Sequence, residues 1–165
     1  MPVDPSIIGS RSPEHSVEVE RGRLRFFAKA TGQNGRVYSA PEAAEQAGHR
    51  DLPVPPTFLV CLDAEKPDSS SFLRELGIDI RTILHGEQSF EYHALAYAGD
   101  RLTFATEVSD VYEKKGGALQ FIVRTTEVTR DRGHRPGSGG PEGELVARIR
   151  NTIVVRELPA KEATA

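Results

Sequence analysis

The chain has 165 residues, a formal net charge of −3 and a hydrophobic content of 38%. This length fits one domain with its own core. The small negative charge argues against binding of nucleic acid or of an anionic membrane surface. Aromatic residues make up only 7% and Trp is absent, so we expect the core to be completed against a partner subunit.

The chain contains one cysteine, Cys61, which lies in an apolar run. It can form no internal disulfide, and we expect a buried thiol in a reducing compartment. No run of eighteen apolar residues occurs, and no cationic segment leads into an apolar stretch near Met1. We therefore expect a cytoplasmic protein without a membrane span.

The ends of the chain differ in composition from its middle. Residues 1–16 mix Pro, Ser and single charges and predict an N-terminal arm. We expect the folded domain over residues 17–157 and a polar C-terminal tail over 158–165. Apolar residues at helical spacing predict a first helix over residues 20–31, which Gly32 ends.

Three further segments before residue 80 carry helix signals. Ser39 as a cap and Pro41 in the first turn predict a short helix that ends at Gly48. The apolar run over residues 57–62 fits a buried strand or a buried helix equally well. A turn of helix is expected over residues 72–76.

The second half of the chain predicts extended segments that are broken by turn residues. The candidate strands are residues 86–97, 101–114, 118–129 and 143–156. Gly116 and Gly117 predict one hairpin turn, and residues 131–143, with five Gly and two Pro, predict a flexible hairpin tip. Helices followed by long antiparallel strands indicate an α+β domain.

His85, Glu87 and His93 form the densest cluster of titratable residues. In a regular strand, residues two apart share a face, so these three side chains would project together. Such a face could hold a general base oriented by a carboxylate, or it could be a polar surface at a subunit interface.

The sequence predicts no metal and no cofactor. His85 and His93 lie eight residues apart, roughly 27 Å in an extended strand, and cannot share one ion. Residues 137–140 are glycine-rich but lack the lysine of a phosphate-binding loop. Gly32, Gly35 and Gly48 follow no predicted strand and form no dinucleotide fingerprint.

Several short blocks together resemble the N-terminal domain of MaoC-like dehydratases. They are residues 26–32, 37–38, 43–51, 54–59, 84–93 and 99–102. The resemblance covers roughly residues 5–157 and implies a single hot-dog fold. In this fold an antiparallel sheet wraps around a central helix, here expected to begin near Pro56, with additional short helices towards the N-terminus.

The resemblance also implies where catalysis would take place. Catalytic members of the family carry an Asp and, five residues later, a His, and here these positions hold Gln33 and Tyr38. An amide does not titrate, and a phenol with a pKa of about 10 is a poor base at neutral pH. No catalytic residue is therefore expected at either position.

Members without this pair resemble the A and C subunits of the heterodimeric (3R)-hydroxyacyl dehydratase of type II fatty acid synthesis. The resemblance implies a subunit that binds an acyl-CoA or acyl carrier protein thioester beside a short catalytic hot-dog partner. We expect substrate-binding residues where the central helix begins, because free backbone N–H groups there can bind a thioester carbonyl. These residues are Pro55, Pro56, Thr57, Phe58, Leu59 and Leu62, although each could instead be plain core.

Three alternatives remain open. A self-sufficient homodimeric hydratase or dehydratase would use His85, Glu87 or His93 as its base. A hot-dog thioesterase would need Asp63 or Glu65 to position water. The third alternative is a non-enzymatic protein for acyl binding or assembly.

Overall fold

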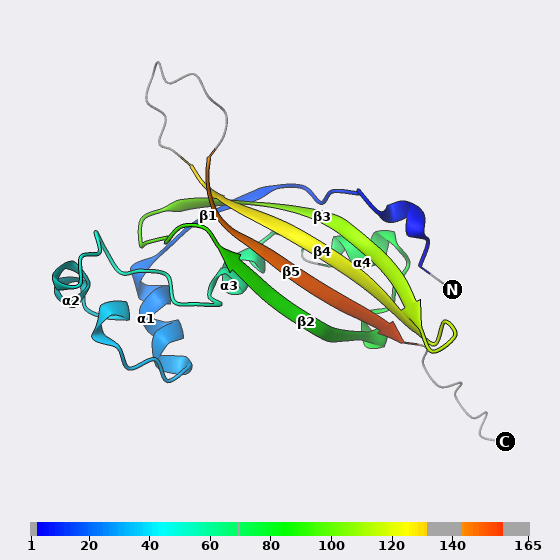
Figure 1. Ribbon diagram of the computed structural model, residues 1–165, viewed down its shortest axis with the longest axis horizontal. Coiled ribbons are helices and arrows are strands. Elements are labelled where there is room, and N and C mark those ends of the chain that lie inside the picture. Colours follow the sequence, from blue (N-terminus) through cyan, green and yellow to red (C-terminus); the bar gives the residue numbers. More distant parts are fainter. Residues whose placement is uncertain (1–2, 69, 132–142, 157–165) are drawn as a thin grey trace, which may run out of the picture.

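The computed structural model describes residues 3–68, 70–131 and 143–156. Their strands form one antiparallel sheet in the order β1-β3-β4-β5-β2 (Figure 1). The strands are β1 His15–Glu18, β2 Ile83–Tyr92, β3 Arg101–Lys114, β4 Leu119–Arg130 and β5 Glu144–Arg156. β1 and β2 are the edge strands, so one side of β2 has no neighbouring strand among the described residues.

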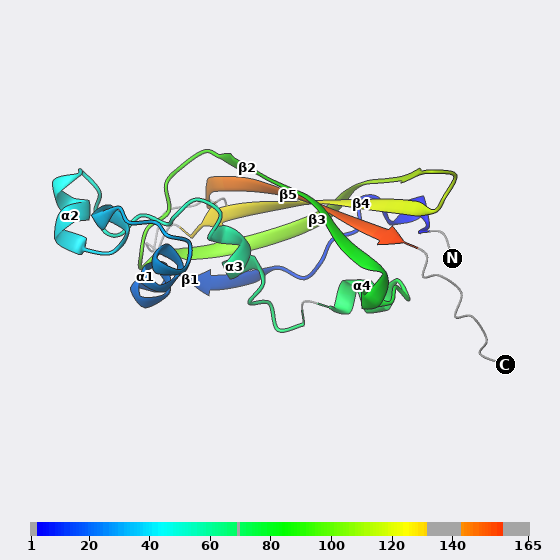
Figure 2. The same ribbon diagram turned by 90° about the horizontal axis from the view of Figure 1, so that it is seen from below.

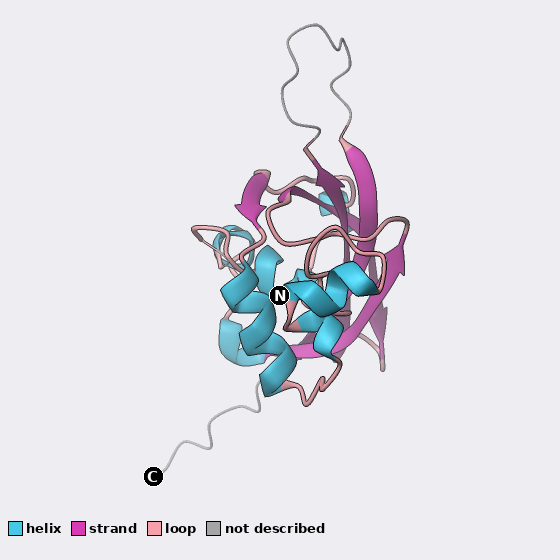
Figure 3. Cartoon of the chain, turned by 90° about the vertical axis from the view of Figure 1, so that its left-hand side faces the viewer, coloured by secondary structure: helices cyan, strands magenta, loops and turns pink. Residues whose placement is uncertain are grey.

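The helices are short and gather on one face of the sheet (Figures 2 and 3). The α-helices are α1 Arg21–Ala30, α2 Pro41–Gln46, α3 Leu59–Asp63 and α4 Ser71–Glu75, and the 3₁₀ turns are η1 Pro5–Ile7, η2 Arg36–Tyr38 and η3 Ile80–Thr82. The sheet packs against α3, the central helix, which confirms the predicted α+β class. Within the described part of the chain, no helix is long and apolar enough to cross a membrane.

Two groups of buried apolar side chains lie on the helical face of the sheet. The larger group joins α1 and α3 to the sheet and includes Leu24, Leu59, Leu62 and Phe104. The smaller group consists of Val108, Ile122 and Ile153, packed against the segment around α4. Burial of this apolar surface is the main force that holds the helices to the sheet.

Part of the predicted N-terminal arm runs along the edge of the sheet beside β3. The Gly9 N–H donates to the Val108 carbonyl at 2.8 Å, and the Val108 N–H donates to the Ser10 carbonyl at 2.9 Å. Residues 15–16, also assigned to the arm, already belong to β1. Backbone hydrogen bonds to β3 therefore order residues 9–12 without any help from an apolar face of their own.

Several predicted boundaries differ from the structure. The helix after Ser39 has Ala40 as its N-cap and ends at Gln46, with no side-chain cap. The ambiguous run over residues 57–62 is helical only from Leu59. β2 spans Ile83–Tyr92 rather than residues 86–97, so it begins and ends earlier than predicted. The predictions for residues 132–142 and 158–165 fall outside the residues that the structure describes.

A β-bulge at Gly86 overturns the predicted side-chain alternation in β2. His85 pairs with Ile153 and Glu87 pairs with Thr152. Between these two pairs the chain moves two residues along β2 but only one residue along β5, so Gly86 is the extra residue of the bulge. Adjacent residues of β5 point to opposite faces, and paired residues share a face. His85 and Glu87 therefore lie on opposite faces, and the prediction that they project together was wrong.

Replacing Gly86 with Ala should destabilise the fold, because the bulge leaves no room for a side chain. A Cβ at this position would lie 2.8 Å from a Val154 methyl group and 3.1 Å from the Thr152 carbonyl oxygen. We expect a loss of about 1–3 kcal/mol in the free energy of unfolding, measured by urea denaturation.

The matched control is Gly22→Ala in α1, where a Cβ would meet no described atom within 4 Å. This substitution should raise the free energy of unfolding by about 0.5–1 kcal/mol. Equal effects of the two substitutions would contradict the close packing at Gly86.

Candidate functional site

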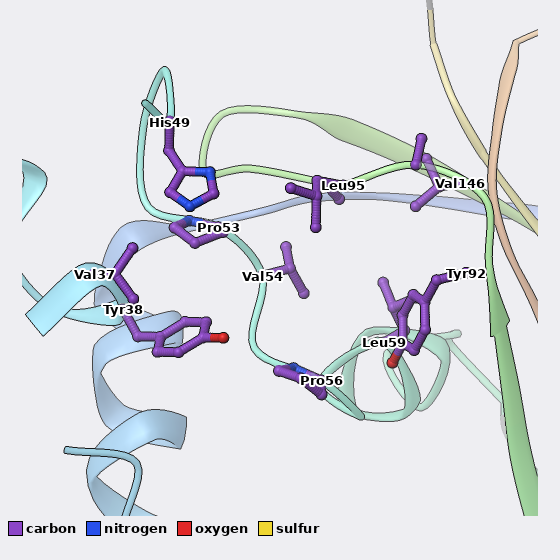
Figure 4. A pocket seen from close by; sticks show the side chains of 12 residues that line it. Val37, Tyr38, His49, Pro53, Val54, Pro56, Leu59, Tyr92, Leu95 and Val146 are labelled. Atoms are coloured by element: carbon purple, nitrogen blue, oxygen red, sulfur yellow. The ribbon is translucent and has the colours of Figure 1, made fainter. Parts of the chain in front are cut away.

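A mainly apolar cavity of about 310 Å³ lies at the end of the sheet near α1 and α2. The turn η2, the segment before α3 and the segment after β2 form its walls (Figure 4). The lining residues are Val37, Tyr38, His49, Pro53, Val54, Pro56, Leu59, Tyr92, Ala94, Leu95, Ala96 and Val146. Its volume is at the lower end of the range for small-molecule sites.

A second cavity, of about 270 Å³, adjoins the first and shares Pro56 with it. It is more polar, and its walls come from the C-terminal end of α1 and the segment that leads into α3. The lining residues are Phe27, Thr31, Gly32, Gln33, Pro55, Pro56 and Thr57. The two cavities therefore meet at the N-terminal approach to the central helix.

Gln33 and Tyr38, which the family resemblance predicts at the positions of the catalytic pair, line these two cavities from neighbouring turns. The Gln33 N–H donates to the Ala28 carbonyl at 2.8 Å, which fixes the chain just after α1. Tyr38 closes the turn η2, and its hydroxyl points into the larger cavity (Figure 4). The site therefore presents an amide and a phenol where acid–base chemistry would require a carboxylate and an imidazole.

The other candidate bases lie elsewhere. His85, Glu87 and His93 line neither of the two cavities. The His85 Nε2 is 3.3 Å from the Asn151 Nδ2, and the His93 Nε2 is 3.5 Å from a Glu91 carboxylate oxygen. The structure thus separates these three side chains instead of bringing them together at the site.

The two carboxylates considered for a thioesterase are also engaged away from the cavities. Glu65 forms an ion pair with Arg23, and Asp63 lies 3.6 Å from the Lys66 ammonium group. Neither carboxylate lines either cavity. Water at the site would therefore have no contact with them.

The predicted substrate-binding residues divide into two sets. Pro55, Pro56, Thr57 and Leu59 line one or both cavities. Phe58 and Leu62 are 3% and 0% exposed and pack in the core. The Phe58 ring meets the Phe27 ring edge to face at 5.0 Å, so its contacts are structural.

The sequence analysis missed His49, a titratable residue in the wall of the larger cavity. Its Nδ1 is 3.3 Å from the Tyr97 hydroxyl, and the Arg50 guanidinium lies 4.6 Å from the centre of the Tyr97 ring. His49 comes from a loop with no periodic pattern, so only the fold brings it to the cavity.

Thr57 holds an unusual backbone conformation at the junction of the cavities. Its φ angle is +71°, a value that costs free energy for a β-branched residue. Its N–H donates to the Tyr92 hydroxyl at 2.9 Å. The chain therefore presents a backbone donor towards the cavities, and Tyr92 from the edge strand occupies that donor.

The buried carboxylate of Asp100 fixes the wall that follows β2. Asp100 is 6% exposed and accepts hydrogen bonds from the Tyr97 N–H at 2.9 Å and from Arg130 at 3.0 Å. It also pairs with Arg50. The same Arg130 nitrogen donates to the Leu95 carbonyl at 2.9 Å. These contacts hold Leu95 and its neighbours against the cavity.

An ion pair ties α1 to the loop that supplies the cavity wall. Arg21 donates two hydrogen bonds to Asp51, at 2.9 and 2.6 Å. The hydrogen bonds from Arg21 keep the pKa of the Asp51 carboxyl below its usual value. Asp51 directly precedes the buried Leu52, so this pair helps to anchor the segment that leads to Pro53.

Asp51→Asn should lower the melting temperature at about pH 7, and this effect should shrink as the pH falls below about 4. The folded chain holds this carboxyl ionised to a lower pH than the unfolded chain does. Its stabilisation is therefore complete above the unfolded pKa of about 4 and is lost as the pH falls through the lower folded pKa. Asp110→Asn, at an exposed site in β3, is the matched control, and a pH-independent loss at Asp51 would contradict the ion pair.

Tyr92→Phe should free the Thr57 N–H. We expect faster amide hydrogen exchange at Thr57 and a fall of about 0.5–1.5 kcal/mol in the free energy of unfolding, because one hydrogen bond is lost. Tyr112→Phe is the control, since that ring stacks on Phe121. Unchanged exchange at Thr57 in Tyr92→Phe would show that the hydroxyl does not protect this donor.

Comparison with known proteins places this geometry in a family. The family described as "FAS1-like, dehydratase domain region" matches residues 6–135. A protein of Saccharopolyspora erythraea, named only as a UPF0336 protein, is 34% identical over 157 residues, which cover 94% of this chain and 93% of that protein.

Solved structures agree with this placement. A chain of the HadBC (3R)-hydroxyacyl-ACP dehydratase complex of Mycobacterium tuberculosis superposes with a TM-score of 0.73 at 27% identity, over 90% of this chain and 96% of that chain. The (R)-hydratase from A. caviae shares the fold, with a TM-score of 0.64 at 17% identity, over 92% of this chain and 96% of that chain. The chain therefore belongs to the FAS1-like dehydratase region family and is a MaoC-like hot-dog domain, as the sequence predicted.

Proposed function

We propose that the chain is the acyl-thioester-binding subunit of a cytoplasmic (3R)-hydroxyacyl-ACP or -CoA dehydratase of fatty acid metabolism, and that a partner subunit supplies the catalytic pair. The observation that carries this proposal is the set of side chains that line the two adjoining cavities. Gln33 and Tyr38 line them, and the family resemblance predicts the catalytic Asp and His at these two positions. A side-chain amide and a phenol support binding but not proton transfer at neutral pH.

The mainly apolar wall of the larger cavity suits the acyl group. Val54, Leu59 and Val146 offer methyl groups, and Tyr38 and Tyr92 face the space from opposite sides (Figure 4). The Thr57 N–H at the junction would donate to the thioester carbonyl once the Tyr92 hydroxyl moves away. In this role the chain positions the thioester, and the partner's base and acid act on its α,β carbons.

The edge strand β2 is the proposed docking site for a short catalytic hot-dog subunit or, in the alternative, for a second copy of the chain. β2 is ten residues long, and its outer edge has no partner strand within the described residues. Leu84 and Tyr92 are 46% and 48% exposed along it. A long unpaired edge with exposed apolar side chains is a template for pairing with another strand. The HadBC chain at 27% identity comes from a two-protein complex, which supports a hetero-oligomer.

The proposal predicts that the purified chain alone does not hydrate enoyl-CoA thioesters, followed by the loss of enoyl absorbance at high protein concentration. Co-purification with a short hot-dog protein that carries the Asp and His should restore turnover. Gln33→Ala in that complex should change turnover less than about tenfold, whereas loss of the partner's His should lower it by about 10²-fold or more.

His49 supplies the decisive control, because it is the imidazole in the wall of the larger cavity. If the chain alone is active and His49→Ala abolishes that activity while Gln33→Ala does not, the chain carries its own base. That result would support the self-sufficient homodimer and overturn the partner-dependent role. Activity that survives both substitutions would also overturn it.

A further inference from the structure

A row of polar side chains crosses the helical face of the sheet between the two apolar core groups. The strand register aligns Val108, Arg124, Asn151 and Gln88 across β3, β4, β5 and β2. On one side lies the row Thr106, Thr126, Ile149 and Phe90, and on the other lie Ile122 and Ile153. We call Arg124, Asn151 and Gln88 the polar row. It interrupts an interior that is otherwise largely apolar.

The polar row carries one half-buried positive charge, that of Arg124, and the Lys66 ammonium group adds a second one near it. Burial lowers the pKa of Arg124, and burial also lowers the pKa of Lys66, whose ammonium group lies 3.6 Å from Asp63. The Arg124 guanidinium lies 4.8 Å from the centre of the Phe72 ring, and its buried Nε has no hydrogen-bond partner among the described residues. Two cations thus share one carboxylate under the central helix.

The rest of the polar row is bound within itself. The Asn151 amide nitrogen donates to the Gln88 side-chain oxygen at 3.0 Å and lies 3.3 Å from the His85 Nε2. These groups hold one another across β5 and β2. A hydrocarbon chain laid over them would break these contacts or cover them without replacing them, and both cost free energy.

The polar row lies beyond the inner end of the larger cavity. Tyr92 lines this cavity, and Gln88 lies four residues back along β2, roughly 13 Å away. Leu59 also lines it, and Asp63 lies four residues along α3, about 6 Å away. Between cavity and row, an acyl chain would meet apolar side chains that can repack. At the row it would meet charges.

We infer, on the basis of the proposed function, that the polar row ends the acyl site and makes the chain selective for short acyl thioesters. Arg124 is the specificity-determining residue in this inference. The modest volume of the larger cavity, about 310 Å³, fits the same limit. A long hydrocarbon tail would have to stay in solvent or leave the site by the open end.

The dependence of binding on acyl chain length distinguishes an acyl site that the polar row closes from one that stays open along the apolar interior. In an open apolar interior each added CH₂ group tightens binding about fourfold, so four of them give about 250-fold. In a closed interior the added groups contribute little. Butanoyl-, octanoyl- and dodecanoyl-CoA are suitable probes because they are saturated and are not hydrated, and titration calorimetry measures their dissociation constants on the full chain.

We expect octanoyl- and dodecanoyl-CoA to bind with dissociation constants within about threefold of each other. Arg124→Met should tighten dodecanoyl-CoA binding by about tenfold or more, while butanoyl-CoA is unaffected. Arg150→Met is the matched control. Arg150 is exposed, and it is the residue before Asn151 in β5, so its side chain points to the opposite face.

A dodecanoyl-CoA that binds the unmodified chain a hundredfold more tightly than octanoyl-CoA would overturn the inference and leave the proposed function intact. If no thioester of any length binds the chain or its complex, the proposed function fails instead. Should Arg124→Met not fold, as judged by circular dichroism, Asn151→Leu replaces it. The chain-length series on the unmodified protein decides the question in either case.

Discussion

The buried carboxylate of Asp100 is the contact on which the site depends. It joins the loop after β2 to Arg130 of β4, and its backbone bonds to Val19, just before α1. A carboxylate at 6% exposure is stable only when its charge is paired and its oxygens accept hydrogen bonds. The same contacts place Leu95 in the cavity wall, so one electrostatic cluster connects the sheet, the entry to the first helix and the larger cavity.

The bulge at Gly86 sets the second constraint, because it decides what each face of β2 presents. With the bulge, His85 lies on the face of β2 that carries Gln88 and contacts Asn151, although its side chain stays exposed. Glu87 and Glu91 share the other face with Ser89. The bulge thereby places His85 and Glu87, which look like parts of one active site in the sequence, on opposite faces of β2, and neither lines either of the two cavities.

The composition of the two cavities supports the proposed binding role. The cavity walls supply methyl groups, one backbone donor, two phenols and the His49 imidazole, while Glu65 and His93 are engaged elsewhere. Thr57 at the junction has a positive φ angle, and this strained conformation costs folding free energy while it holds a backbone donor in place. In the proposed function a second protein supplies the catalytic pair, and the edge strand β2, which has no outer neighbour among the described residues, contributes Tyr92 to the site.

The sequence alone determined the fold class, through local periodicity and glycine turns, and the hot-dog family, through short blocks of residues. The same family resemblance predicts that Gln33 and Tyr38 replace the catalytic pair. It also located Pro55, Pro56 and Thr57 at the site. Only the tertiary structure decided that Phe58 and Leu62 are core, that His49 enters the cavity and that His85 leaves the face of Glu87. The physical reason is that a bulge and a long-range strand register place side chains, and neither leaves a periodic signal in the sequence.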